Sequence, residues 1–292
     1  MNRIAIPIPD SDCYNDFMRT ILSREPLSPL VVKTTILAPQ IALAAQPGQF
    51  VVIIPTEKGE RIPLTIAAAD PALGTITVIF QLAGATTRLL SSLPVGEKVS
   101  HLLGPLGVPS EIEKFGRVVV VGGGVGIAEI YPGVKALKAA GNEVVTIIGA
   151  RNKELLFYES ELRAQSTELR LITDDGSSGR RGFVTELLSE AIKDKPTQRV
   201  IAVGPVPMMK ACCDLTPGIK TIVSLNSLML DATGMCGVCR VKIGGLNKLT
   251  CVEGPDFDGH LVDFADLTSR LGTYKDLEKR ADDHICRLLG SK

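Results

Sequence analysis

The chain has 292 residues and 45% of them are hydrophobic, which is enough for about two domains with sizeable cores. Lys plus Arg and Asp plus Glu each number 32, so the formal net charge is zero. That balance argues against nucleic-acid or membrane binding driven by bulk charge. No segment reaches the roughly 18 apolar residues of a membrane helix, and residues 1–27 show no targeting pattern. We therefore expect a cytoplasmic protein with reduced cysteines.

Residues 28–112 predict a small antiparallel β barrel. Short β-rich runs occur at Leu30–Leu37, Gln49–Pro55 and Thr75–Gln81, with Pro and Gly turns between them. Strands at this regular spacing are typical of barrels. Residues 1–27 lie outside the pattern and are treated as an N-terminal extension.

Two short motifs in this segment could contact a phosphate or the edge of a flavin. The first is Arg61-Ile62-Pro63-Leu64-Thr65, and the second runs from Gly84 to Arg88 through two threonines. A cation and hydroxyl groups are suitable donors for such ligands. Composition alone does not separate these motifs from ordinary strand-end turns.

Residues 113–224 alternate strands and helices, a rhythm that predicts parallel strands in a doubly wound α/β sheet. The expected strands are continuous apolar runs, as a sheet covered on both faces requires. They are Arg117–Val121, Glu143–Gly149, Glu168–Thr173, Arg199–Val203 and Ile219–Ser224. The first expected helix runs from the glycine-rich segment after Val121 to Ala140. The others span Lys153–Gln165, Phe183–Lys193 and Met208–Cys213.

A glycine-rich turn joins the first of these strands to its helix. It contains Gly122, Gly123, Gly124 and Gly126. Glycines there let backbone N–H groups approach a pyrophosphate, whose charge the helix N-terminus favours. A tight turn without ligand is the alternative, but the position at the start of an α/β series favours a dinucleotide site.

Residues 225–292 predict a small iron–sulfur module and a polar tail. Asp231, Cys236, Cys239 and Cys251 follow the pattern Asp-x4-Cys-x2-Cys-x11-Cys. Plant-type [2Fe–2S] proteins use Cys-x4-Cys-x2-Cys with a distant fourth Cys, so Asp231 stands in the place of the first. Two alternatives are structural zinc with His260 as the fourth ligand, and a loop-capping role for Asp231.

Together these motifs resemble the ferredoxin–NADP reductase superfamily over residues 28–255. The resemblance is to the branch that holds electron-transfer subunits of dihydroorotate dehydrogenase, of sulfide dehydrogenase and of electron-bifurcating NADH-dependent ferredoxin:NADP oxidoreductase. Asp at the first ligand position favours the bifurcating type. The anchors are Arg61-x-Pro-x-Thr65, Gly104-Pro-Leu-Gly107, Gly122–Pro132, Gly149-Ala-Arg151, Thr173–Gly176, Gly204–Met209 and the Asp231 cluster.

The resemblance implies roles for the matching residues. Arg61, Pro63, Leu64 and Thr65 would lie along FAD, and Gly84, Thr86 and Thr87 would hold its pyrophosphate. Gly122, Gly123, Gly124 and Gly126 would hold the nicotinamide dinucleotide, with Asp174, Asp175 and Met208 nearby. Asp231, Cys236, Cys239 and Cys251 would hold the cluster.

The implied function is electron transfer between NAD(H), FAD and the cluster, to or from a larger flavin and iron–sulfur partner subunit. A flavin exchanges both one and two electrons, so it must lie between nicotinamide and cluster. The protein then positions and tunes these groups, and no acid–base triad is expected. A non-catalytic redox sensor is the alternative from another class.

Two features leave the details of nicotinamide binding undecided. The first is Glu129, which stands at a position where members of the resembling family have Pro. Asp174 and Asp175 favour NAD, whereas Arg151 and the pair Arg180-Arg181 favour NADP, which we expect less.

Overall fold

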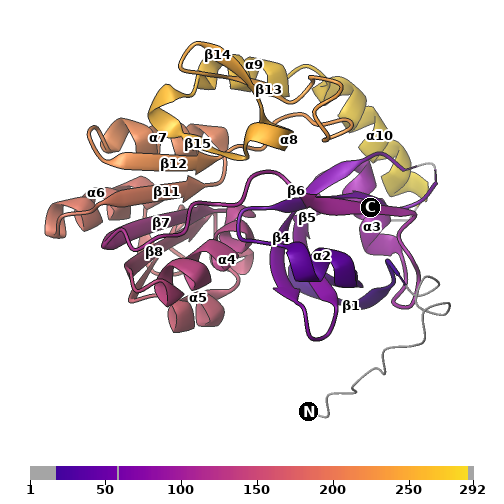
Figure 1. Cartoon of the computed structure of the whole chain (residues 1–292), viewed down its shortest axis with the longest axis horizontal. Coiled ribbons are helices and arrows are strands. Elements are labelled where there is room, and N and C mark those ends of the chain that lie inside the picture. The colour runs from indigo at the N-terminus through magenta and orange to yellow at the C-terminus, as the bar shows by residue number, and fades with distance from the viewer. Residues whose placement is uncertain (1–17, 58, 289–292) are drawn as a thin grey trace.

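The computed structural model describes residues 18–57 and 59–288. Two β-sheets lie beside each other, and the C-terminal segment passes over both (Figure 1). We call the six-stranded one the small sheet and the seven-stranded one the large sheet. Most of the extension predicted over residues 1–27 lies outside the described residues.

The small sheet is antiparallel and has the order β1-β2-β5-β4-β3-β6. Its strands are β1 (Ile21–Ser28), β2 (Val31–Leu37), β5 (Thr75–Gln81), β4 (Ile62–Asp70), β3 (Phe50–Ile54) and β6 (His101–Leu106). The three predicted strands are present, and β1, β4 and β6 were not predicted. Apolar residues of β1, β2, β3 and β5 form its core together with the short helices α2 (Pro39–Ala44) and α3 (Ala85–Ser92).

Strand β1 corrects the view that residues up to 27 lie outside the sheet. Its Ile21 is fully buried in the core. The polar run Ser23-Arg24-Glu25 follows in the sequence and interrupts the alternation of apolar and polar residues by which a strand is recognised. The Ile21 N–H donates to the Glu97 carbonyl at 2.8 Å, and the Gly96 N–H donates to the Ile21 carbonyl at 2.9 Å. These bonds join β1 to the segment that precedes β6, and the closed barrel stays a prediction.

The large sheet has the order β10-β9-β8-β7-β11-β12-β15 and is parallel except for β15 at its edge. Its strands are β7 (Arg117–Gly123), β8 (Glu143–Ala150), β9 (Glu168–Thr173), β10 (Arg180–Arg181), β11 (Arg199–Val203), β12 (Lys220–Ser224) and β15 (Asp256–Asp258). The five predicted strands are confirmed within two residues at each end.

Helices cover both faces of the large sheet, which explains its uninterrupted apolar strands. Val119 and Val121 of β7 face α6 (Val184–Asp194) and α7 (Val206–Leu215). Val118 and Val120 face α4 (Gly126–Ala139) and α5 (Glu159–Gln165), and this second core continues into the small sheet. Helix α4 is therefore the element that joins the two sheets.

The single helix predicted over Lys153–Gln165 is wrong. The structure has a short 3-10 helix η1 (Lys153–Leu155) and then α5, with three residues between them. Phe157 is buried in the core there, and Tyr158 has a left-handed φ of 59°. Burial of Phe157 thus overrides the local helical pattern.

The C-terminal segment is more ordered than a polar tail. It contains β13 (Arg240–Ile243), β14 (Leu246–Leu249), α8 (Thr250–Glu253), η2 (Gly259–Leu261), α9 (Phe264–Leu271) and α10 (Lys275–Leu288). Helix α10 packs on α3, where Arg88 Nε lies 2.7 Å from Asp282 Oδ1. None of the helices in the described ranges is long and apolar enough to cross a membrane.

Candidate functional site

The glycine-rich turn between β7 and α4 has two structural roles. A Cβ on Gly126 would lie 2.3 Å from the Val203 carbonyl oxygen, so this glycine lets α4 approach β11 closely. Gly124 has a φ of +58°, and a Cβ there would meet nothing within 4 Å. The turn therefore presents open backbone at the N-terminus of a 14-residue helix, where N–H groups favour an anion.

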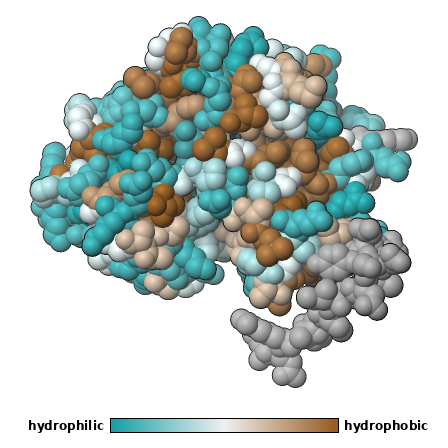
Figure 2. Space-filling model, viewed as in Figure 1, coloured by the Kyte–Doolittle hydropathy of each residue, from teal (hydrophilic) through white to brown (hydrophobic). Residues whose placement is uncertain are grey.

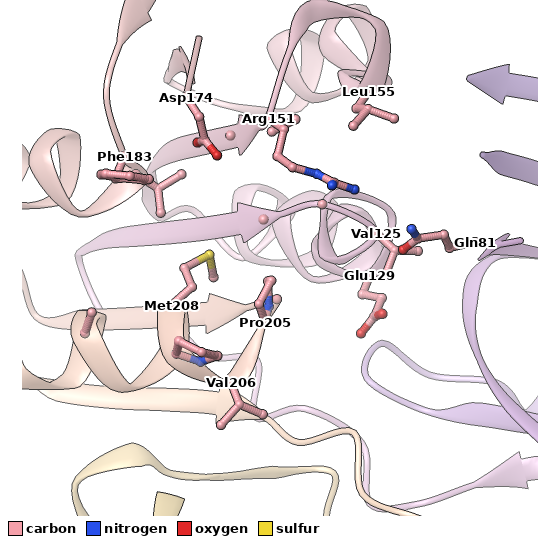
Figure 3. Close-up of a pocket in the computed structure, with 18 of the residues that line it drawn as sticks. Gln81, Val125, Glu129, Arg151, Leu155, Asp174, Phe183, Pro205, Val206 and Met208 are labelled. Carbon is pink, nitrogen blue, oxygen red and sulfur yellow. The ribbon is translucent and has the colours of Figure 1, made fainter. Parts of the chain in front are cut away.

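A cavity of about 880 Å³ lies in front of this turn (Figure 3). Four of the predicted dinucleotide residues line it, namely Gly123, Gly124, Asp174 and Met208. Gly122 and Gly126 are buried behind it and set the packing of α4. The cavity lies beyond the carboxyl ends of the parallel strands, where α/β sheets bind ligands.

Asp175 differs from its neighbour, because its side chain is used within its own turn. Its Oδ1 accepts hydrogen bonds from the Ser177 N–H at 2.9 Å and from the Ser177 hydroxyl at 2.6 Å. These bonds hold the pKa of Asp175 below its usual range. Asp175 does not line the cavity, so of the predicted pair only Asp174 does.

The cations near the cavity also differ in availability. Arg180 Nη1 lies 2.8 Å from Glu190 Oε1, and Arg180 Nη2 lies 3.4 Å from Glu186 Oε2. Arg151 lines the cavity and forms no ion pair with any residue that the structure describes. Arg151 is thus the cation that could favour NADP in this cavity, where Asp174 favours NAD.

We expect NADH to be preferred over NADPH by roughly tenfold, or about 1.4 kcal/mol. A carboxylate at Asp174 suits the free ribose hydroxyls of NADH and repels a 2′-phosphate. Steady-state reduction of an artificial dye with each dinucleotide measures the ratio of kcat/KM values. Asp174→Asn should narrow that ratio, and Asp175→Asn should change it less. A clear preference for NADPH would overturn the expectation.

The residues predicted to contact FAD lie along β4 and at the start of α3. Arg61 is exposed and precedes β4, while Pro63, Leu64 and Thr65 lie within that strand rather than in a turn. Gly84 caps α3, and its N–H donates to Thr87 Oγ1 at 3.1 Å. A Cβ on Gly84 would meet nothing within 4 Å, so a ligand can approach this backbone. Thr86 is half-buried on the same first turn.

The predicted cluster ligands lie in the loop before β13 and on the adjoining helix α8, a region called the cluster loop below, and they form two close pairs. Cys236 Sγ lies 2.8 Å from Asp231 Oδ1, and Cys239 Sγ lies 3.1 Å from Cys251 Sγ. The first pair is exposed and the second is buried. Burial raises the pKa of Cys251 to about 12. Three thiols and one carboxylate are a donor set that suits iron.

Asp231 is also bonded within the loop, as a capping residue would be. Its Oδ2 accepts from Thr233 Oγ1 at 3.0 Å, from the Met235 N–H at 3.0 Å and from the Cys236 N–H at 3.2 Å. The Cys236 thiol and these donors hold the pKa of Asp231 well below its usual range. An ionised carboxylate is the form that a metal ion requires.

The zinc alternative with His260 is not supported. His260 Nε2 lies 3.1 Å from the Thr216 carbonyl oxygen, and Nδ1 lies 3.3 Å from Asp258 Oδ1. The histidine thus belongs to the edge of the large sheet. Across the described ranges no three His, Cys, Asp or Glu side chains converge as a ready-made site for one metal ion.

Several cavity residues were not predicted from the sequence. Gln81 ends β5 of the small sheet, Ser224 ends the large-sheet strand β12, and Asn226 follows that strand. The rule that ligands bind beyond the carboxyl ends of parallel strands could have identified Ser224. No sequence signal marks Gln81, because it reaches the cavity only through the packing of the two sheets.

Comparisons with known proteins agree with this geometry. Residues 120–214 match the oxidoreductase NAD-binding domain, and residues 226–263 match the iron–sulfur cluster binding domain of dihydroorotate dehydrogenase B. A Thermotoga maritima homolog of the dihydroorotate dehydrogenase B electron transfer subunit is 44% identical over 255 residues, covering 87% of this chain and 90% of that protein. The Geobacillus thermodenitrificans electron transfer subunit is 32% identical, covering 82% and 95%.

Solved structures give the same result. A chain of the NADH-dependent reduced ferredoxin-NADP oxidoreductase is 41% identical with a TM-score of 0.88, covering 91% of this chain and 97% of that one. An Amycolatopsis cytochrome P450 reductase, at 20% identity and a TM-score of 0.56, shares the fold alone.

Fold and site thus define an NAD-binding oxidoreductase subunit with an iron–sulfur domain. The chain belongs to the ferredoxin–NADP reductase family, among relatives of the dihydroorotate dehydrogenase B electron transfer subunit.

Proposed function

We propose that the chain passes electrons between NAD(H), FAD and a [2Fe–2S] cluster, as a subunit that exchanges them with a larger partner. The observation that carries this proposal is the contact between the cluster loop and the small sheet. Arg61 Nη1 lies 3.5 Å from the Asp231 carbonyl oxygen. Cys239 and Cys251 pack with Phe50 and Val52 of β3, the strand beside β4.

The dinucleotide cavity reaches the same sheet at β2 and β5, which lie across β4 from β3. Its lining includes Leu30, Val31 and Gln81 of the small sheet besides the glycine-rich turn. A flavin held along β4 would therefore lie between nicotinamide and cluster. FAD would exchange a hydride with the nicotinamide and single electrons with the iron.

The residues of this chain bind and orient these groups. The backbone at Gly124 and the N-terminus of α4 would hold the dinucleotide pyrophosphate. Arg61, Pro63, Leu64 and Thr65 would lie along FAD, with Gly84, Thr86 and Thr87 at its pyrophosphate. Asp174 would bind the ribose at the far end of the cavity, and Met208 would pack beside the Gly123 backbone, which has no side chain to block it.

The pairing of the ligands favours a [2Fe–2S] cluster over a single ion. Each iron of such a cluster takes two protein ligands, whereas one zinc ion takes four around itself. Asp231 with Cys236 would bind one iron, and Cys239 with Cys251 the other. Asp231 would then replace a thiolate at the more exposed iron.

A partner surface is supported by apolar side chains around the exposed ligand pair. Leu230 is 58% exposed, Met235 89% and Val252 45%. Figure 2, in the view of Figure 1, shows apolar patches within the polar surface at the top of the molecule, where the C-terminal segment lies. Such residues next to a redox centre favour a docked protein, since exposed apolar patches mark interaction sites. The proposed partner is a larger flavin and iron–sulfur subunit.

The bifurcating ferredoxin:NADP oxidoreductase type is the preferred assembly, supported by the similarity to a chain of that enzyme over nearly its full length. Electron-transfer subunits of dihydroorotate or sulfide dehydrogenase are the alternatives. The proposed units are residues 28–112 for FAD, extended back to Ile21 by strand β1, 113–224 for the dinucleotide and 225–292 for the cluster. A cytoplasmic location is proposed because cluster thiolates must stay reduced.

An anaerobic titration tests the function. Adding NADH to the purified full chain should bleach the flavin absorbance and produce a reduced iron–sulfur signal in electron paramagnetic resonance. The chain that co-purifies from the native host separates the assemblies, since a dihydroorotate-oxidising partner would overturn the bifurcating type. Cofactors that bind but accept no electrons from NADH or NADPH would favour the redox-sensor alternative.

A further inference from the structure

The two ends of the dinucleotide cavity differ in their neighbours. Figure 3 shows Gln81, Val125 and Glu129 at the end nearer the small sheet, with Asp174 and Phe183 at the other end. If the flavin lies along the small sheet, as proposed above, the nicotinamide ring must lie at the Glu129 end. Hydride transfer requires the two rings to be in contact.

Glu129 lies in the first turn of α4 and lines two cavities at once. Besides the large cavity, it borders a small one of about 40 Å³, which residues of β4, β7, β11, β12 and β15 also line. Thr65, Ser110 and Asp256 line this second cavity as well. Glu129 therefore stands between the nicotinamide end and the interior of the protein.

The carboxyl of Glu129 has no cationic partner among the residues that the structure describes. The charged residues that line either cavity are Glu129, Asp256, Arg151 and Asp174. Elements packed against α4 carry other charged groups that line neither cavity: Asp70, Arg117, Glu143, Glu159, Glu161, Arg163 and Arg199. Asp256 is the acidic neighbour, and its Oδ2 accepts from Ser110 Oγ at 2.5 Å.

Burial and, to a lesser extent, the charge of Asp256 raise the pKa of Glu129 to about 7. Burial also raises the pKa of Asp256. The N-terminus of α4 opposes these effects, because it favours a negative charge. Glu129 therefore changes its charge within the physiological range.

We propose that Glu129 discriminates between the two redox states of the bound nicotinamide. The oxidised ring carries a positive charge and the reduced ring is neutral. An ionised Glu129 attracts the first and has little effect on the second. The carboxyl thus acts as a specificity-determining residue that links nicotinamide binding to pH.

The direction of the linkage follows from the charges. Binding of NAD⁺ stabilises the ionised form, so it lowers the pKa of Glu129 and releases a proton. The affinity for NAD⁺ therefore rises as the pH rises through about 7. A one-unit fall in pKa on binding makes NAD⁺ bind roughly fivefold more tightly at pH 8 than at pH 6. A dinucleotide with a neutral nicotinamide ring should show little change.

Calorimetry on the full chain with oxidised FAD and cluster tests this inference. The two ligands are NAD⁺ and 1,4,5,6-tetrahydro-NAD, an analogue of NADH whose ring is neutral and cannot give up hydride. We expect the ratio of their affinities to shift roughly fivefold between pH 6 and 8. Titration in two buffers of different ionisation enthalpy should show release of about 0.4 proton per NAD⁺ at pH 7.

Two variants complete the test. Glu129→Gln keeps the shape and loses the ionisation, so both the pH shift and the proton release should disappear. Asp174→Asn removes a carboxylate from the other end of the cavity and should weaken binding while keeping the pH shift. A flat ratio in the natural protein, or an unchanged shift in Glu129→Gln, would overturn the inference. Absence of NAD⁺ binding at either pH would overturn the proposed function with it.

Discussion

Asp231→Ala is expected to leave the protein with little cluster iron. The variant removes a ligand from the exposed pair, and Cys236 alone cannot hold the iron there. Loss of a residue that only orients a ligand already weakens metal binding roughly 10- to 100-fold, and loss of a ligand should exceed that. Iron and sulfide analysis with electron paramagnetic resonance of the reduced protein measures the effect.

Asp231→Asn separates ligation from loop capping. Its side-chain oxygen can still accept from Thr233 and from the backbone N–H groups of Met235 and Cys236, which Asp231 Oδ2 contacts. The amide is a poor ligand for iron, because it carries no charge. A full cluster in Asp231→Asn would therefore contradict ligation and favour the capping role.

Asp231→Cys should keep a [2Fe–2S] cluster and lower its midpoint potential. A carboxylate donates less electron density to iron than a thiolate does, so the natural cluster should favour the reduced state more. A redox titration followed by electron paramagnetic resonance compares the two proteins. Cys286→Ser serves as the control, since this cysteine lies on α10 beside Arg88, away from the loop. An unchanged signal and potential in Asp231→Ala would rule out Asp231 as a ligand.

The large sheet could be predicted because its strands are apolar throughout and carry their own signal. The small sheet was only half predicted. Its strand β1 shows four exposed residues after Ile21, and β4 contains Pro63, so neither follows a simple alternation. Their assignment depends on pairing with β2 and β3, and the sequence pattern of β1 and β4 alone does not show this pairing.

The binding sites also differ in how far the sequence predicts them. Glycine and cysteine spacing marks the turn before α4 and the cluster loop, because each ligand demands a local backbone shape. The second half of the cavity is different. Gln81 and Glu129 come together only when the sheets pack, and Asp175 could be separated from Asp174 only by its bonds to Ser177.

Arg61→Ala should purify with little flavin. Arg61 is exposed at the start of β4, and it forms no ion pair with the residues that the structure describes. Among the described residues, Arg61 makes one long hydrogen bond, to the Asp231 carbonyl oxygen, so the guanidinium is free to bind a phosphate. A hydrogen bond to a charged group contributes about 1.5–3 kcal/mol, so FAD should bind roughly 10- to 150-fold more weakly.

The control for Arg61 must separate charge from shape. Arg61→Lys keeps the positive charge but loses the planar fork that binds phosphate with two hydrogen bonds, so it should retain an intermediate amount of FAD. Lys33→Ala removes a cation of the small sheet that is paired with Glu25, and should retain all of it. The cluster signal should survive in each variant, because Arg61 contacts only the backbone of the cluster loop. A full flavin spectrum in Arg61→Ala would show that FAD is held elsewhere, and the path from nicotinamide to cluster along β4 would then have to be abandoned.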